Sequence, residues 1–254
     1  MNPRRDDAPL LVVEKVIKRF GALTALDGVS LELSPGAAHG VVGPNGSGKS
    51  SLLNCVAGHY TPSGGRITYA GANITAAPVG SGRRRGIART FQNLQLAPSL
   101  TLEENAMLGL QRTRDGGRRT EGRLRARARA LLDDWGVAGY ADAYPQTVPY
   151  GVRKVTEIVR ALLAEPDLLL LDEPAAGLSP AERAEFAANL ARFHAARAGT
   201  CLVLVEHDVA FVRRICRTLT VLDYGRVVRT GEADAVMSDP AVVRSFLGRE
   251  PDDD

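Results

Sequence analysis

The chain has 254 residues, of which 44% are hydrophobic and 24% are charged, and its formal net charge is +3 at pH 7. This length suffices for one large α/β domain or for a core with a small subdomain, and the hydrophobic share supports a buried core. Only four of the 32 basic residues are lysines. The excess of arginine indicates a compositional bias, and we expect no nucleic-acid partner from so modest a net charge.

The cysteines and the apolar segments indicate the redox compartment of the protein and its relation to the membrane. Cys55, Cys201 and Cys216 lack metal-like or redox-like spacing, which suits buried thiols in a reducing compartment. The first ten residues, MNPRRDDAPL, contain no apolar core of a signal peptide. No stretch reaches the ~18 continuous apolar residues of a membrane span. We therefore expect any role at a membrane to depend on partner proteins.

The first part of the chain predicts strands. Residues 10–17 alternate loosely between apolar and polar side chains, as a strand does. The segment SLELSPGAAHGVV predicts a second strand, a turn at 34–36 and a buried strand at 39–42. GGRITYAG, residues 64–71, predicts a hairpin strand at a sheet edge.

Helices and strands alternate in the rest of the chain. The pattern is helical from about 100 to 132, with an interruption, and apolar residues at 155, 158, 159, 162 and 163 form one face of a helix. Leu168–Leu171 predicts a central strand covered on both faces. A helix after Pro180, a strand at 201–205, a further helix and a hairpin at 218–232 follow. This alternation predicts an α/β fold with a mostly parallel sheet.

Eight arginines lie between Arg112 and Arg129. They could form a patch for a polyanion or a solvated helical face. The interspersed Asp115 and Glu121 favour the solvated face.

A phosphate-binding loop is the clearest motif. GPNGSGKS fits the pattern G-x-x-x-x-G-K-[ST], and it lies between a buried strand and a helix that ends at Gly58. Because a strand precedes the loop and a helix follows it, a glycine-rich turn that matches the motif by chance is disfavoured. Backbone N–H groups and the helix N-terminus should surround phosphate oxygens, Lys49 should reach the β- and γ-phosphates, and Ser50 should hold Mg²⁺. The predicted nucleotide-binding residues of this loop are Gly43, Pro44, Asn45, Gly46, Ser47, Gly48, Lys49, Ser50 and Ser51.

Acidic residues end the buried strand in LLLLDEP. Asp172 can hold Mg²⁺, and Glu173 can polarise a water molecule aimed at the γ-phosphate, as a general base. His207 ends the strand in CLVLVEHD, where it can contact the γ-phosphate and orient that water. Each of these residues alone could be an ordinary polar strand end; the phosphate loop is what favours the catalytic interpretation.

Taken in order, these segments resemble the nucleotide-binding subunit of an ABC transporter, over about residues 10–248. The matching motifs are the Walker A loop 43–50, the Q-loop with Gln92 in RTFQN, the signature region 148–152, the Walker B segment 168–172 with Glu173 after it, the D-loop 176–179 and the switch residue His207. The resemblance implies that Gln92 contacts Mg²⁺ and acts as a nucleotide-sensing hinge. It also implies that the ring of Phe20 stacks on adenine, where the alternative is a core aromatic residue.

The resemblance implies a P-loop NTPase (RecA-like) core with an antiparallel β subdomain, at 10–92 and 153–248. It also implies a helical insert at 93–152, between tails at 1–9 and 249–254. Two such subunits sandwich two ATPs, each between one phosphate loop and the other subunit's signature region. The helical insert should dock two membrane permeases, which places the chain at the cytoplasmic face of the membrane.

The signature region departs from the usual L-S-G-G-Q. Here it reads Val148-Pro149-Tyr150-Gly151-Val152, so Pro149 offers neither a hydroxyl nor an N–H group to the partner's γ-phosphate. Loss of one such contact costs about 1.5–3 kcal/mol. Pro149, Tyr150 and Gly151 still precede a helix, predicted at 152–164, whose free N–H groups and dipole favour an anion. Two interpretations of this region stay open: a variant signature that still works, and a degenerate one.

Three segments narrow the resemblance to importers of branched-chain amino acids and related small amides. They are GIARTFQNLQLAPSLTLEENAMLGL, LLLLDEPAAGLSPAE and DPAVVRSFLG. In that subset the D-loop commonly lacks its aspartate, as at Ser179. Implied partners are a second ATPase, identical or paralogous, two permeases and, indirectly, a solute-binding protein. The alternatives are an exporter or lipid-handling system, a regulatory subunit that binds ATP without hydrolysis, and a soluble ATPase acting on DNA or ribosomes.

Overall fold

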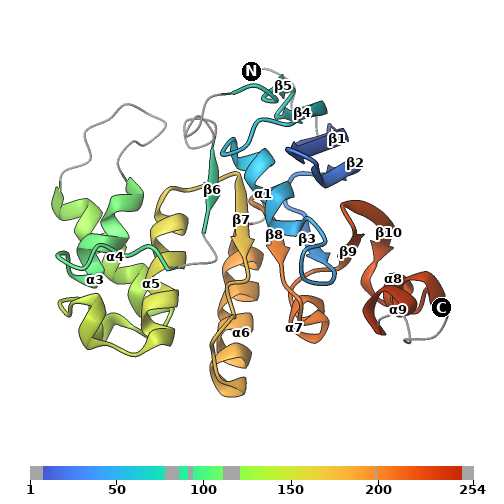
Figure 1. The fold of residues 1–254 in the computed structure, drawn as a ribbon. Helices are drawn as coiled ribbons and strands as arrows, with labels where there is room; N and C mark the ends of the chain where they lie inside the picture. The colour runs from blue at the N-terminus through green and yellow to red at the C-terminus, as the bar shows by residue number, and fades with distance from the viewer. Residues whose placement is uncertain (1–7, 78–85, 91–93, 111–120, 198, 248–254) are drawn as a thin grey trace.

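The computed structural model describes residues 8–77, 86–90, 94–110, 121–197 and 199–247 (Figure 1). One sheet is antiparallel and has the order β2-β1-β4-β5. Its strands are β1 (Leu11–Phe20), β2 (Leu23–Leu33), β4 (Gly64–Tyr69) and β5 (Ala72–Asn73). The predicted hairpin at a sheet edge is confirmed: the chain turns back at Gly71, and the two-residue strand β5 pairs with the end of β4 at the edge of this sheet.

The other sheet has six strands in the order β10-β9-β3-β8-β7-β6, and every neighbouring pair except β9 and β10 is parallel. Its strands are β3 (Ala38–Val42), β6 (Ile87–Arg89), β7 (Leu168–Asp172), β8 (Cys201–Val205), β9 (Thr218–Asp223) and β10 (Arg226–Glu232). The predicted α/β class, with a mostly parallel sheet and an antiparallel β part, is confirmed.

Strand β7 shows why an unbroken apolar run becomes a central strand. All five of its residues are buried. Because side chains alternate along a strand, Leu168 and Leu170 enter the core below the antiparallel sheet, whereas Leu169 and Leu171 enter the core against the large helices. Both faces of β7 therefore need apolar side chains.

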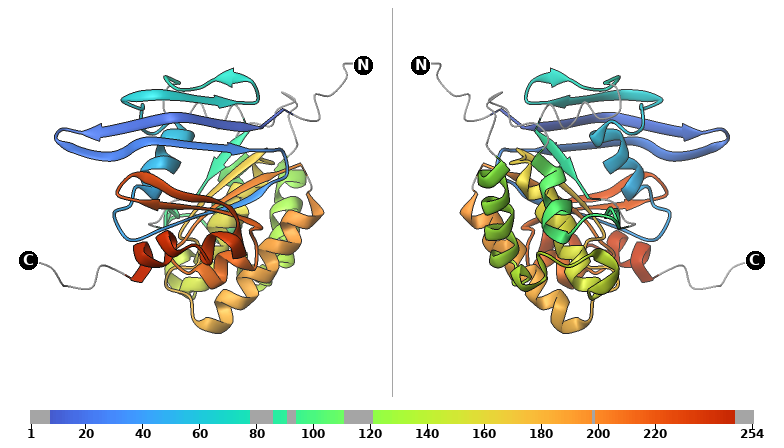
Figure 2. Two further views of the ribbon diagram at one scale, coloured as in Figure 1. Left: turned by 90° about the vertical axis from the view of Figure 1, so that its right-hand side faces the viewer. Right: turned by 90° about the vertical axis from the view of Figure 1, so that its left-hand side faces the viewer.

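Helices cover both faces of the six-stranded sheet (Figures 1 and 2). Helix α1 (Lys49–Ala57) lies between the two sheets, and its apolar residues share one core with β1, β2, β4 and β7. On the opposite face are α5 (Tyr150–Leu163), α6 (Pro180–Ala196) and α7 (Val209–Arg213), and the C-terminal part adds α8 (Ala233–Met237) and α9 (Pro240–Leu247). The predicted helix after Pro180 is confirmed, with Pro180 in its first turn.

A helical layer stands beyond β6 (Figure 1). It contains α3 (Leu102–Met107), η1 (Leu108–Leu110), α4 (Glu121–Asp134), η2 (Ala138–Tyr140), η3 (Pro145–Thr147) and α5. The boundaries predicted for the helical insert, 93 and 152, stay predictions, and α5 spans the second of them.

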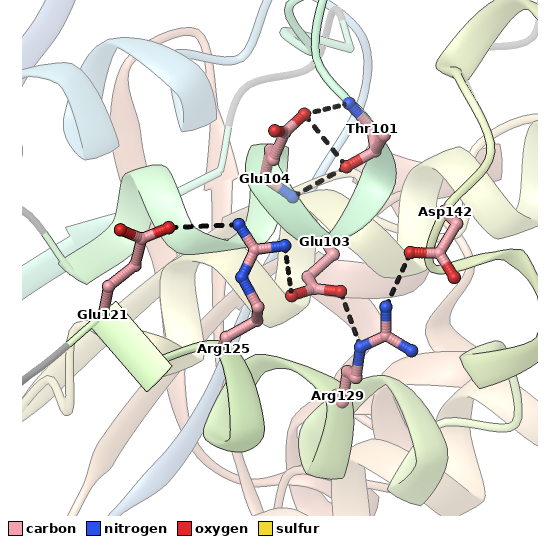
Figure 3. A network of polar contacts seen from close by, with 7 residues as sticks. All are labelled: Thr101, Glu103, Glu104, Glu121, Arg125, Arg129 and Asp142. Carbon is pink, nitrogen blue, oxygen red and sulfur yellow. Dashed lines mark hydrogen bonds and ion pairs between the residues drawn. The ribbon is translucent and has the colours of Figure 1, made fainter. Parts of the chain in front are cut away.

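A buried carboxylate joins α3 to the arginines of α4 (Figure 3). Glu103 is 1% exposed, and its oxygens lie 3.4 Å from Arg125 Nη1 and 2.6 Å from Arg129 Nε. Arg125 also pairs with Glu121, and Arg129 with Asp142. These arginines are solvated, as predicted, and they also neutralise a buried charge; residues 111–120 of the arginine-rich segment lie outside the described residues.

Cys55, Cys201 and Cys216 are buried and free, as predicted. In the described part of the chain, no helix combines the length and apolar character that a membrane span requires.

Candidate active site

The loop between β3 and α1 has the backbone that a phosphate-binding loop requires. A β-carbon on Gly43 would lie 2.1 Å from the Leu222 carbonyl oxygen, and one on Gly48 would lie 2.5 Å from the Ala25 carbonyl oxygen. No larger residue fits at either position without moving the backbone. Gly48 caps α1 without a side-chain hydrogen bond, so the first N–H groups of the helix stay available to an anion.

A cavity of about 830 Å³ opens over this loop. It brings together most of the predicted site: Phe20, the loop residues Gly43 to Ser51, Glu173 and His207. Leu23, Thr24, Ala25 and Tyr224 complete its wall. Residues from five separate parts of the chain therefore line this cavity, and the phosphate loop, Glu173 and His207 follow the carboxyl ends of parallel strands, where open α/β sheets bind ligands.

Lys49 places a buried positive charge at this loop. Its Nζ donates hydrogen bonds to the carbonyl oxygens of Gly43 and Pro44, both at 2.8 Å. Burial lowers the pKa of Lys49, while the nearby carboxylates of Glu173 and Asp172 act to raise it. The ammonium group is thus held beside the two carboxylates that were predicted to be functional.

Asp172 joins the loop to the end of β7. Ser50 Oγ donates to Asp172 Oδ1 at 3.1 Å, so the two predicted metal ligands lie together. The other oxygen, Oδ2, accepts from Arg89 Nη2 at 2.9 Å, and both side chains of this ion pair are buried. Burial lowers the pKa of Arg89, and its contact with Asp172 acts in the opposite direction. Arg89 also donates to Asn54 of α1.

Two buried residues at the site were missed at the sequence level. Arg89 lies in RTFQN, but its partner is 83 residues away and is reached only through the pairing of β6 with β7. Glu206 directly precedes His207 in VEHD, and its position at the end of the buried strand β8 was the available signal.

Glu206 supports the segment that follows β7. It is 1% exposed, and its Oε1 accepts a hydrogen bond from Ala175 N at 3.0 Å. Burial raises the pKa of the Glu206 carboxyl, and the hydrogen bond from Ala175 partly opposes that shift. His207 is half-exposed at the cavity, with Nδ1 3.7 Å from Glu206 Oε2.

Glu173 has an unusual backbone. Its φ angle is 46°, in the left-handed region that a residue with a side chain rarely adopts, and its N–H donates to the Val205 carbonyl oxygen at 2.9 Å. This conformation costs on the order of 1–3 kcal/mol and is typical of functional sites. It brings Glu173 to the cavity wall beside His207.

Phe20 also lines the cavity, and it is 42% exposed. Its ring meets Tyr60 edge-on, with centroids 5.1 Å apart, and Lys18 Nζ lies 4.8 Å from the ring centre. The alternative of a core aromatic residue is therefore wrong. Stacking on adenine stays a prediction.

The signature region lies away from the cavity. Helix α5 begins at Tyr150 with Pro149 as its N-cap, two residues earlier than the predicted start. Gly151 lies against α6, since a β-carbon there would be 2.7 Å from Glu182 Oε1. Gln92, the predicted Q-loop residue, lies outside the described residues.

Comparison with known proteins identifies the family. Residues 26–176 match the family described as ABC transporter. The chain belongs to this family. Its fold and its phosphate loop agree with that membership, so the chain is an ATP-binding cassette, the ATPase subunit of a transporter.

Similar proteins cover nearly all of this ATP-binding cassette. The high-affinity branched-chain amino acid transport ATP-binding protein LivG of Salmonella typhimurium is 33% identical, over 94% of this chain and 98% of the relative. The solved structure of MJ1267, an ATP-binding cassette of an ABC transporter, has a TM-score of 0.84 at 29% identity, over 94% of this chain and 99% of that one. The dimeric cassette MJ0796, bound to ADP and Pi, has a TM-score of 0.78 at 26% identity, over 88% and 98% of the two chains.

Proposed function

We propose that this cassette binds Mg-ATP in the cavity over the phosphate loop and powers the import of branched-chain amino acids or related small amides. The observation that carries the proposal is the meeting of Lys49, Glu173 and His207 around one cavity, with Ser50 and Asp172 joined beside it. In this assignment Phe20 stacks on the base and the loop N–H groups hold the phosphates. Glu173 accepts a proton from the attacking water, which His207 orients toward the γ-phosphate.

The residues at this site fit Mg²⁺. Ser50 Oγ and Asp172 Oδ1 are oxygen donors 3.1 Å apart, the kind of ligand that Mg²⁺ prefers alongside nucleotide phosphates. Ser47 Oγ in the same loop is buried and has no hydrogen-bond partner among the described residues, as expected for a loop shaped to hold a ligand. Bound there, the ion would neutralise charge on the β- and γ-phosphates. Gln92 is proposed as a further ligand of the ion.

A second ATPase subunit, identical or paralogous, completes the proposed site. ATP on this chain's phosphate loop would face the partner's signature region, and this chain's own signature region would face the partner's ATP. The dimeric form of the similar cassette MJ0796 supports a dimer here. Two permeases would dock on the helical layer, which places the chain at the cytoplasmic face of a membrane. A solute-binding protein would act indirectly.

The substrate class is supported by LivG, which is named for branched-chain amino acid transport and matches over nearly its whole length. The variant signature and the D-loop with Ser179 in place of aspartate agree with that subset. Uptake of labelled leucine by cells whose chain carries Glu173→Gln tests the assignment, with labelled proline as the control. Loss of leucine uptake with unchanged proline uptake supports the assignment. Unchanged leucine uptake would assign the chain to another transport system.

Hydrolysis by the purified chain tests the catalytic assignment. We expect Glu173→Gln to lower ATP turnover by roughly 100- to 10 000-fold, because a general base is removed, while ATP binding persists. Lys49→Ala should instead weaken binding. A Glu173→Gln variant with wild-type turnover would disprove the role of Glu173.

The mass of Glu173→Gln in solution, with and without Mg-ATP, tests the partner. An ATP-dependent dimer would show that the variant signature still holds a γ-phosphate. A monomer that binds ATP would indicate a different partner chain or a degenerate signature.

A further inference from the structure

The signature region packs directly on the D-loop of its own chain. Gly177 has a φ angle of 80°, and a β-carbon there would lie 2.9 Å from Tyr150 Cε1 and 3.5 Å from Cδ1 and Cζ. The ring of Tyr150 therefore lies against the Gly177 backbone, where only glycine leaves room for it. The next residue, Gly151, lies against Leu178 and Glu182 in the same way.

A short run of turns connects Gly177 to Glu173. Ala176 N donates to the Glu173 carbonyl oxygen at 3.2 Å, and Leu178 N donates to the Ala175 carbonyl oxygen at 3.2 Å. Glu173 is in turn fixed to β8 through the Val205 carbonyl oxygen. Because these hydrogen bonds leave little freedom between 173 and 178, a displacement of Gly177 would change the backbone at Glu173.

Tyr150 also lies at the N-terminal end of α5, where the free N–H groups and the helix dipole favour an anion. It is the first residue of the helix, whose N-cap, Pro149, provides no side-chain hydrogen bond. Arg153 Cζ lies 5.4 Å and Lys154 Nζ 5.8 Å from the centre of its ring, within range of cation–π attraction. The ring is thus held between cations on α5 and the D-loop backbone.

We propose that Tyr150 is a positioning residue that couples the signature region to Glu173 of the same chain through its contact with Gly177. The proposal rests on the proposed ATP sandwich: when a partner's γ-phosphate binds at the start of α5, the Tyr150 ring transmits the movement to the D-loop and so to the general base. Occupancy of one composite site is thereby linked to catalysis at the other.

Amide hydrogen exchange on the full chain tests the contact without any need for turnover. In Tyr150→Ala, the amides of Ala176 and Leu178 should exchange roughly 2- to 30-fold faster than in the wild type, because the D-loop loses its support. Tyr150→Phe keeps the ring and should exchange at the wild-type rate. Tyr144→Ala, a change at an exposed tyrosine of the same helical layer, is the matched control. Equal exchange in Tyr150→Ala and Tyr150→Phe would overturn the proposal.

Steady-state hydrolysis then tests the consequence for catalysis. Tyr150→Ala should lower kcat by roughly 2- to 30-fold with little change in KM for ATP, and Tyr150→Phe should restore kcat. Gly177→Ala should act through the same contact, so its effect should be smaller when combined with Tyr150→Ala than alone. Additive effects, or a change in KM alone, would contradict the coupling. A wild-type chain without ATPase activity, both alone and together with a paralogous partner ATPase, would disprove the proposed function instead and leave the exchange result standing.

Discussion

The Arg89 guanidinium donates to Asp172 Oδ2 at 2.9 Å, and the side chains of the pair are only 7% and 1% exposed. The pair joins the edge strand β6 to the strand that ends in the functional carboxylates. Because Asp172 Oδ1 accepts from Ser50, Arg89 fixes the orientation in which Asp172 faces the phosphate loop. Arg89 therefore supports both the stability of the sheet edge and the geometry of the proposed metal site.

Removal of Arg89 should lower the free energy of unfolding. In Arg89→Ala, Asp172 stays buried without its cation, and breaking a buried pair in this way costs about 3–5 kcal/mol. Urea unfolding measures the loss, and hydrolysis should fall with it. The matched control is Arg226→Ala, which removes the exposed pair with Asp27 and should cost about 0–1 kcal/mol. Equal losses in the two variants would contradict the role given to burial.

The cluster of Glu103, Arg125 and Arg129 should lose more stability when its arginines are removed than when its carboxylate is removed (Figure 3). Arg125 and Arg129 are 44% and 48% exposed, so water can solvate them when Glu103 is replaced by glutamine. If both arginines become alanine, the Glu103 charge stays buried without them. We expect the double variant to have a lower unfolding midpoint than Glu103→Gln, by urea titration. The reverse order would show that the arginines contribute mainly through solvent-exposed contacts.

The fold could be predicted where one local pattern decides the structure. The leucines of β7 specify a strand buried on both faces, and GPNGSGKS between a strand and a helix specifies a phosphate loop. Arg89 and Glu103 could not be paired with their partners, because each pair depends on contacts between elements distant in the sequence. The predicted start of α5, residue 152, is two residues late because proline and glycine are poor helix formers. Packing of Tyr150 and Gly151 on the D-loop outweighs that preference.

Phe20 offers a test of the proposed base site. Phe20→Ala should weaken ATP binding by about 1–3 kcal/mol, or roughly 5- to 150-fold, because stacking with the base is lost. Equilibrium titration with ATP measures the change, and Phe20→Tyr should bind like the wild type. Unchanged binding in Phe20→Ala would place the base elsewhere in the cavity, where Tyr224 provides another exposed aromatic ring.

His39 predicts how stability depends on pH. It is 2% exposed within β3, with Nδ1 2.7 Å from Thr218 Oγ1 and Nε2 2.9 Å from Thr220 Oγ1. Burial lowers the pKa of His39 from 6.5 to about 4. As the pH falls below 6.5, the unfolded chain takes up this proton before the folded chain does, so the free energy of unfolding decreases. Between pH 6.5 and pH 5 the loss from this group should be about 2 kcal/mol.

Urea unfolding at pH 7, 6 and 5 measures this effect, with His39→Gln as the comparison. Glutamine does not titrate and can still bond to the two threonine hydroxyls, so its stability should fall less on acidification. Glu206 acts in the opposite sense, because its raised pKa makes the folded chain bind a proton first as the pH falls. That contribution is common to both proteins and cancels in the comparison. Parallel pH profiles for the wild type and His39→Gln would show that other groups control the acid sensitivity.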